Sequence, residues 1–174
     1  DINYFGEKSE VAKAKALLAE AGFPNGFETS ITMASSFPPM MAMAPIIQAN
    51  LAAIGIKAKI DSMEVPRYWD EIWGPSKFDM TAMYWLSPLA DPDDFVTNNY
   101  KRGMAVNVQK SGTPELDAIL DAAKQATTQD ARKELYKKMQ QMSLDEMGII
   151  PLVNGHLLIA HSKKLQGYVP MRTG

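Results

Sequence analysis

Trp85 closes a segment, Phe78–Trp85, whose side chains alternate in the manner of a β-strand. An irregular stretch containing proline follows, and it ends at Asp91. The indole face can stack on a flat or apolar part of a small molecule, and hydroxyl and backbone groups beside it can supply hydrogen bonds. Open α/β sheets bind ligands in this place, beyond the carboxyl ends of their strands. The pattern therefore predicts non-covalent recognition of a small molecule.

Residue patterns suited to catalysis or to metal binding are scarce. The sequence has no Gly-x-Ser-x-Gly nucleophile motif, phosphate-binding loop, dinucleotide fingerprint or His-Glu-x-x-His metal motif, and it has no cysteine. Its two histidines, His156 and His161, lie five positions apart in a segment with strand character, so they are expected to face opposite sides. We therefore expect no enzyme activity, no cofactor and no bound metal.

Three acidic residues, Asp91, Asp93 and Asp94, allow two interpretations. A calcium loop of the EF-hand type needs Gly at its sixth position and Glu at its twelfth, where this chain has Val96 and Arg102. A helix start fits better, because an aspartate cap followed by proline and further acids suits the positive end of a helix dipole. We therefore predict that Asp91 caps a short helix.

Composition places the chain among ordinary globular proteins. Of its 174 residues, 46% are hydrophobic and 22% are charged, which is enough for one domain with a core. The net charge is −2 and basic residues occur in pairs rather than in a stripe, which argues against a nucleic-acid partner. No apolar run approaches the length of a membrane-spanning helix. The chain begins with Asp1 rather than Met, so we expect it to be a piece of a longer protein.

Strands and helices alternate in the first half of the chain, and helices dominate the second half. The predicted strands span 27–35, 56–61, 78–85, 149–153 and 157–160, and the first predicted helices span about 11–21, 41–54 and 65–73. Ser9 is the expected cap of the first helix, Thr113 begins a fourth, and Thr127 has capping-box spacing to Asp130 at a fifth. The buried faces of the last two helices are expected to carry Leu116, Ile119, Leu120 and Ala123, and Leu135, Met139 and Met142. The strand–helix–strand order at 27–61 predicts a βαβ unit.

The large apolar side chains outside these faces have different settings. Trp69 and Trp73 fit a helix that packs on the core. Met40 and Met41 stand beside a proline-rich loop and are candidates for an exposed apolar surface. Trp85 is expected to face a ligand, with packing in the core as the alternative.

Taken in order, these segments resemble the extracytoplasmic solute-binding proteins of ABC importers, in the branch that handles peptides, nickel and other solutes. The segments that carry the resemblance are Lys13–Phe23, Ile47–Leu51 with Ile54–Ile56, Phe78–Trp85 with Asp91–Asp93, Pro114–Asp117 and Ile150–Leu152. Each motif is weak alone, whereas their order and spacing together are fairly specific. The resemblance covers nearly the whole chain.

The resemblance implies an α/β fold, a lobe like those of the type II periplasmic binding proteins, with a mixed sheet flanked by helices. Family members are two-lobed and much longer than 174 residues, so residues 1–174 are expected to form a single lobe, most of the carboxyl-terminal one. The expected partners are a small or peptide-like solute, a membrane permease of the ABC type and the amino-terminal lobe of the same parent chain. The expected location is periplasmic or extracytoplasmic. A ligand-sensing or interaction domain with the same lobe fold is the alternative, and an enzyme comes third.

Position and resemblance together assign half of a binding site. Trp85 would stack on the solute and Ser87 would bond it, while the residues beside them and the loop after the strand at 27–35 would form the adjoining walls. The other assigned residues are Tyr84, Leu86, Pro88, Asp91, Ser35, Ser36 and Phe37. Peptide binders of the family usually carry aspartate where this chain has Pro88, and some dipeptide binders carry arginine within the stretch that corresponds to Ser30–Pro39, which has none. These two differences from the peptide binders of the family argue against a peptide as the solute.

Overall fold

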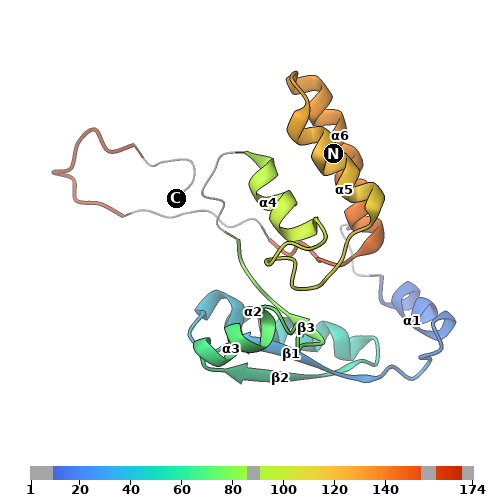
Figure 1. Ribbon diagram of the computed structural model, residues 1–174. Helices are drawn as coiled ribbons and strands as arrows, with labels where there is room; N and C mark the ends of the chain where they lie inside the picture. Colours follow the sequence, from blue (N-terminus) through green and yellow to red (C-terminus); the bar gives the residue numbers. More distant parts are fainter. Residues whose placement is uncertain (1–9, 86–90, 154–159, 170–174) are drawn as a thin grey trace. The chain divides into compact units, whose positions relative to one another are not determined.

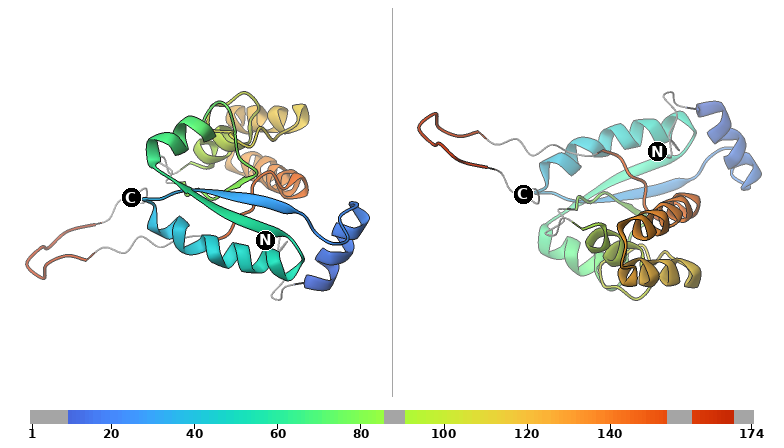
Figure 2. Two further views of the ribbon diagram at one scale, coloured as in Figure 1. Left: turned by 90° about the horizontal axis from the view of Figure 1, so that it is seen from below. Right: turned by 90° about the horizontal axis from the view of Figure 1, so that it is seen from above.

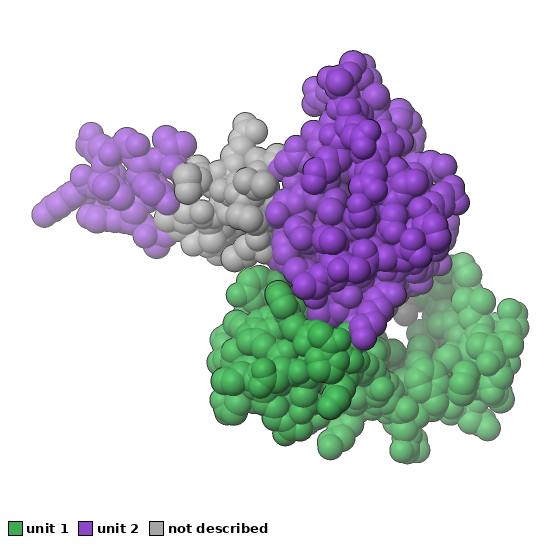
Figure 3. Space-filling model, in the orientation of Figure 1, with its two compact units in different colours: residues 1–84 green, residues 85–174 purple. Residues whose placement is uncertain are grey.

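The computed structural model describes residues 10–85, 91–153 and 160–169. The chain divides into two compact units, residues 1–84 and residues 85–174, which are coloured separately in Figure 3. The assignment of residues 1–174 to a single lobe stays a prediction.

The first unit holds the strands, and the second unit is helical (Figure 1). The elements of the first unit are α1 (Val11–Glu20), β1 (Glu28–Ala34), α2 (Pro38–Ala53), β2 (Lys57–Met63), α3 (Val65–Ile72) and β3 (Met80–Thr81). Those of the second unit are α4 (Pro92–Tyr100), α5 (Pro114–Gln125) and α6 (Gln129–Glu146). Within the described ranges, no helix is both long and apolar enough to cross a membrane.

The sheet has the strand order β2-β1-β3, and its described strands are all parallel. Ile31 of β1 pairs with Ile60 of β2 on one side and with Met80 of β3 on the other. The predicted βαβ unit is therefore confirmed as β1–α2–β2. The α/β class is confirmed as well, although the mixed arrangement that we expected is not seen among these three strands. One predicted strand, 149–153, is irregular, and most of another, 157–160, lies outside the described residues.

Helices cover both faces of β1. Ile31 and Met33 point to one face and are fully buried against Met40 and Ala44 of α2. On the other face, the hydroxyl of Tyr68 in α3 lies 2.8 Å from the Thr81 hydroxyl, which donates to the carbonyl oxygen of Thr32 at 2.9 Å. Both views in Figure 2 show α2 and α3 on opposite sides of the strands. The continuous burial of residues 31–34 follows from this central position.

Two glycines let the turns before β1 and β2 approach each other. Gly26 has φ +73° and Gly55 has φ +96°, both in the left-handed region that side chains disfavour. A Cβ on Gly26 would overlap the backbone carbonyl oxygen of Gly55. Beside this contact, the Lys57 amide donates to the carbonyl oxygen of Phe27 at 2.9 Å. The close approach therefore sets the register at which the two strands begin.

The second unit is built from capped helices around a small apolar core. Thr113 caps α5 by accepting a hydrogen bond from the Leu116 amide at 3.1 Å, as predicted. The core consists of Tyr100, Leu116, Ile119, Leu120 and Met139, with Phe95, Val96, Leu135, Met142 and Ile149 packed against it. The predicted face of α5 is confirmed. On α6, Met139 is buried and Leu135 and Met142 are half-buried, while Tyr136 and Ser143 are buried although we did not predict them.

Several local predictions were wrong. The strand expected at Phe78–Trp85 is reduced to the two residues of β3, and β1 itself ends at Ala34, where the chain turns at Ser35 and Ser36 and leaves residues 84–85 without a strand to pair with. Helix α2 begins at Pro38 rather than near residue 41, so Met40 is 2% exposed and belongs to the core. Helix α6 is capped by Thr128, not by Thr127. The expected cap of α1, Ser9, lies outside the described residues, and Glu10 occupies the cap position.

Candidate functional site

The segments that follow β1 and β3 meet at the carboxyl end of the sheet. Phe37, after β1, and Tyr84, after β3, have ring centroids 5.8 Å apart in an edge-to-face arrangement. Phe37 is half-buried and Tyr84 is 52% exposed, so this pair presents aromatic surface at the edge where parallel sheets bind ligands. Ser35 and Ser36 form the turn just before Phe37, and both are exposed. The structure thus brings together four of the residues assigned from the sequence.

Two tryptophans of α3 extend this aromatic surface. The ring of Trp69 lies 6.1 Å from Phe37 and 5.2 Å from Trp73, between ring centroids. We call Tyr84, Phe37, Trp69 and Trp73 the aromatic run. We predicted that Trp69 and Trp73 pack on the core, but Trp69 is half-buried and Trp73 is 39% exposed. The core face of α3 is instead supplied by Tyr68 and Ile72, both fully buried.

A hollow of about 550 Å³ opens at the α3 end of the aromatic run. Its described lining consists of Trp69, Asp70 and Trp73. Asp70 is exposed, and its carboxylate has no hydrogen bond or ion pair with any described residue. The nearest basic residue along the helix, Arg67, is bonded to Glu71 at 2.8 Å. The hollow therefore combines two indole rings with a carboxylate.

Trp85 belongs to the second unit and is half-buried. Its ring lies 6.1 Å from that of Phe95, between centroids. The indole N–H is buried and has no hydrogen-bond partner among the described residues, although buried donors are nearly always paired. Leu86, Ser87 and Pro88 lie outside the described residues. The assignment of Trp85 to solute binding stays a prediction.

Asp91 holds the start of α4, as predicted. Its carboxylate accepts a hydrogen bond from the Asp93 amide at 2.9 Å and caps the helix. Arg132 of α6 donates to both carboxylate oxygens, at 2.8 and 3.0 Å. The hydrogen bonds from Arg132, and then the bond from Asp93, lower the pKa of Asp91 below its usual range. In the parts of the chain that the structure describes, no cluster of metal-binding side chains forms, at Asp91 or elsewhere.

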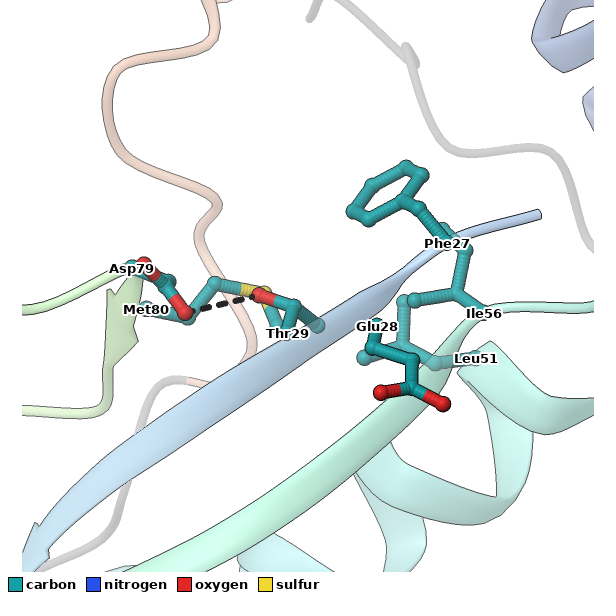
Figure 4. Close-up of a pocket in the computed structure, with 7 residues that line it drawn as sticks. All are labelled: Phe27, Glu28, Thr29, Leu51, Ile56, Asp79 and Met80. Atoms are coloured by element: carbon teal, nitrogen blue, oxygen red, sulfur yellow. Dashed lines mark hydrogen bonds between the residues drawn. The ribbon is translucent and has the colours of Figure 1, made fainter. Parts of the chain in front are cut away.

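A second hollow, of about 420 Å³, lies at the opposite end of the sheet, where the strands begin (Figure 4). It is lined by Phe27, Glu28, Thr29, Leu51, Ile56, Asp79 and Met80. Asp79 accepts hydrogen bonds from the Ser30 hydroxyl at 2.8 Å, the Ser30 amide at 2.9 Å and the Thr29 hydroxyl at 3.3 Å. The bonds from Ser30 lower the pKa of Asp79. These bonds join β3 to β1, so Asp79 has a structural role.

Comparisons with known proteins agree with the fold. Residues 2–105 match the model of the bacterial extracellular solute-binding proteins, family 5, middle part. The glutathione-binding protein GsiB of Salmonella paratyphi A is 30% identical over 171 residues, and a dipeptide-binding protein of Pseudomonas aeruginosa is 31% identical over 163. Both alignments cover 90% of this chain but only 32% and 30% of those proteins. The chain thus spans about a third of the length of these curated relatives.

Solved structures give the same result. The periplasmic binding protein DppA of Helicobacter pylori, in complex with the peptide STSA, superposes with a TM-score of 0.72 and 31% identity over 84% of this chain. HbpA2 of Haemophilus parasuis gives a TM-score of 0.73 and 32% identity over 80%. Each match covers about 30% of the other chain, at 30% and 29%. The relatives from Salmonella paratyphi A and Pseudomonas aeruginosa are named as binding proteins.

Proposed function

Because this chain belongs to the bacterial extracellular solute-binding proteins of family 5, we propose that it supplies one wall of a solute-binding site in a two-lobed protein. The protein would work outside the cytoplasmic membrane and deliver its solute to an ABC-type permease. The proposed solute is a small peptide-like or other polar compound, since relatives are named for glutathione and a dipeptide, although another is named for heme. Binding is non-covalent and involves no cofactor.

The contact between Phe37 and Tyr84 carries this proposal. The two residues lie far apart in the sequence and meet where parallel strands end, the usual place of a ligand in an α/β sheet. Aromatic rings stack on apolar and planar groups at little conformational cost. The Ser35–Ser36 turn beside them is exposed and offers hydroxyl and backbone groups for hydrogen bonds. Trp85 and Ser87 stay in the proposal as solute contacts assigned from the sequence.

The chain would carry only part of the site. It covers about 30% of its relatives, and ligand pockets usually enclose most of a small ligand. We place residues 1–174 in the carboxyl-terminal lobe and assign the opposite wall to the rest of the parent protein. Loss of a wall costs several kcal/mol, so the isolated chain should bind the solute about a thousandfold more weakly than the parent. Calorimetry on both with one solute measures this ratio, and equal affinities contradict a half-site.

Native mass spectrometry of the protein at its natural length tests the function and identifies the solute. We expect a small molecule to co-purify with the wild-type protein and to be lost from a Tyr84→Ala variant. Tyr168→Ala is the matched control, because Tyr168 is similarly exposed, at 46%, but lies outside the proposed site. A carried solute that both variants retain equally would contradict the site.

A further inference from the structure

The side chains of Trp69, Asp70 and Trp73 form a corner on the surface of α3. Trp69 and Trp73 are one helical turn apart, which places them on the same side of the helix. Their rings meet edge to face, at 82° and 5.2 Å between centroids, so that the indoles stand at nearly a right angle. The hollow of about 550 Å³ lies against these two rings and Asp70. This arrangement is open to a ligand, since Trp73 is 39% exposed.

The charge of the corner is negative and is not compensated within the described residues. Asp70 has no bonded or paired partner there. Arg67, one turn before, is bonded to Glu71, which removes it as a partner. The faces of the indole rings are also negative, because of the aromatic quadrupole. A cation is therefore attracted both by the rings and by the carboxylate, whereas an anion is repelled.

The shape of the corner selects among cations. Indole surfaces favour a weakly hydrated cation with surface that can lie against the ring, such as a substituted ammonium or a guanidinium group, over a small hydrated ion. A neutral apolar group would bury Asp70 without compensating its charge, which is unfavourable. We propose that Trp69, Asp70 and Trp73 form a subsite for a cationic end group of the solute, of the substituted ammonium or guanidinium type.

The proposed subsite depends on the proposed function, and the contact of Phe37 with Trp69 connects the two sites. Phe37 touches Trp69 as well as Tyr84, so the aromatic run is continuous from the end of β3 to the hollow. A solute stacked on Phe37 and Tyr84 can therefore extend along the rings and place its end beside Asp70. Position 88 holds proline, which has no charge and cannot supply an acid for a cationic solute, whereas Asp70 can.

Choline and its neutral isostere 3,3-dimethylbutan-1-ol are the probes that test the subsite. Both have the same shape, and only choline is charged. Titration calorimetry on the solute-free protein at its natural length should show choline binding about tenfold tighter than the isostere, as contacts of a cation with tryptophan predict. Trp73→Leu should remove most of this preference. Equal affinities for the two probes would overturn the proposal.

Two variants that each remove one negative charge distinguish an effect of Asp70 from an effect of net charge. Asp70→Asn keeps the shape of the side chain and should weaken choline binding about threefold, the value of an ion pair at an exposed position, with no change for the isostere. Glu134→Gln removes the same charge from an exposed position on α6 and should change neither affinity. Similar effects of the two variants would mean that net charge, not the corner, attracts choline.

Competition separates this subsite from the function itself. The solute identified by mass spectrometry should displace choline from the wild-type protein. If the solute is carried and depends on Tyr84 but does not displace choline, the subsite is wrong and the proposed function stands. If no carried solute is lost from the Tyr84→Ala variant, the proposed function is wrong, whatever the affinity for choline.

Discussion

Arg132 of α6 donates two hydrogen bonds, at 2.8 and 3.0 Å, to the two carboxylate oxygens of Asp91, the residue that caps α4. The same guanidinium donates to the Tyr136 hydroxyl at 2.9 Å and to the carbonyl oxygen of Ala123 at 3.2 Å. One side chain thus joins the start of α4 to α5 and α6 within the second unit. The bidentate geometry fixes the orientation of the Asp91 carboxylate as well as its position.

Substitutions of Asp91 separate its two roles. Asp91→Asn keeps a good helix cap but loses the ion pair with Arg132, and the pair is partly exposed, so we expect a loss of about 1 kcal/mol in the free energy of unfolding. Asp91→Ala loses the cap as well, which adds about another 1 kcal/mol. Urea denaturation measures both values. In an Arg132→Met background, Asp91→Asn should cost almost nothing, and an unchanged cost would show that the pair contributes no stability.

The Asp91 carboxylate should also make stability depend on pH. Its pKa in the folded protein is lowered, first by the hydrogen bonds from Arg132. The unfolded chain, with an ordinary aspartate pKa of about 3.9, therefore takes up the proton first as the pH falls. The stabilisation is complete above that value and is lost as the pH falls through the folded pKa. The Asp91→Asn variant is less stable than the wild type at neutral pH, and this difference in unfolding free energy should shrink as the pH falls from about 5 to about 3. A constant deficit would contradict the assigned cause.

Features set by neighbouring residues could be predicted from the sequence. Thr113 and Asp91 cap helices through amides two or three positions away, so sequence alone reveals them. The same reasoning gave the wrong cap for α6, because the adjacent residues Thr127 and Thr128 both offer a hydroxyl group that could cap the helix. The pair of Arg132 with Asp91 joins residues 41 positions apart, and no local pattern indicates it.

The site was predictable to the extent that strand order decides it. Parallel β1 and β3 bring Phe37 and Tyr84 to one edge. The βαβ pattern predicted only the pairing of β1 with β2, and both residues were assigned to the site from position and resemblance. The exposure of Trp69 and Trp73 did not follow, because they share one apolar face of α3 with Val65, Tyr68 and Ile72, and spacing alone assigns that whole face to the core. Only the packing of Tyr68 against Thr81 decides which side faces the sheet.

Substitution by alanine should cost more stability at Gly26 than at Gly22, although both glycines precede β1 and have a positive φ. Gly26→Ala combines a positive φ with an overlap of the new Cβ and the Gly55 carbonyl oxygen, so the turns must separate. We expect a loss of about 3 kcal/mol or more in unfolding free energy, combining backbone strain with lost strand register. Gly22→Ala is the control, because its φ is +88° but nothing lies within 4 Å of the new Cβ, and only about 1 kcal/mol of strain is expected. Equal losses in a denaturation experiment would refute the close contact.

The indole N–H of Trp85 offers a test of whether this side chain binds solute. Trp85→Phe keeps a ring beside Phe95 and removes a buried donor that has no partner among the described residues. Because an unpaired buried donor costs about 1–3 kcal/mol, its removal should offset the lost contacts and leave stability nearly unchanged. Solute affinity of the protein at its natural length should fall about three- to tenfold, because the phenyl ring offers the solute less stacking surface than the indole. Unchanged affinity, with a large loss of stability in Trp85→Ala, would place the ring in the core.

Pro88 bears on whether free peptides are solutes. Proline has neither a charge nor an N–H, so it cannot hold the ammonium group of a peptide as an aspartate can. Asp91 is not available for that task, because Arg132 and the start of α4 occupy its carboxylate. We therefore expect that a crystal structure of the protein at its natural length with an unmodified dipeptide will not show the ammonium group in the loop 86–91.

A gain of function checks the same prediction in solution. Losing one partner of a buried ion pair costs about 3–5 kcal/mol, so supplying the missing acid should strengthen binding measurably. Pro88→Asp should raise the affinity for a free dipeptide, relative to its N-acetylated form, by at least about tenfold. Gln140→Glu adds the same charge at an exposed position on α6, outside the assigned site, and should leave that ratio unchanged. If the wild-type protein already holds the ammonium group in this loop with micromolar affinity, the role assigned to Pro88 is wrong.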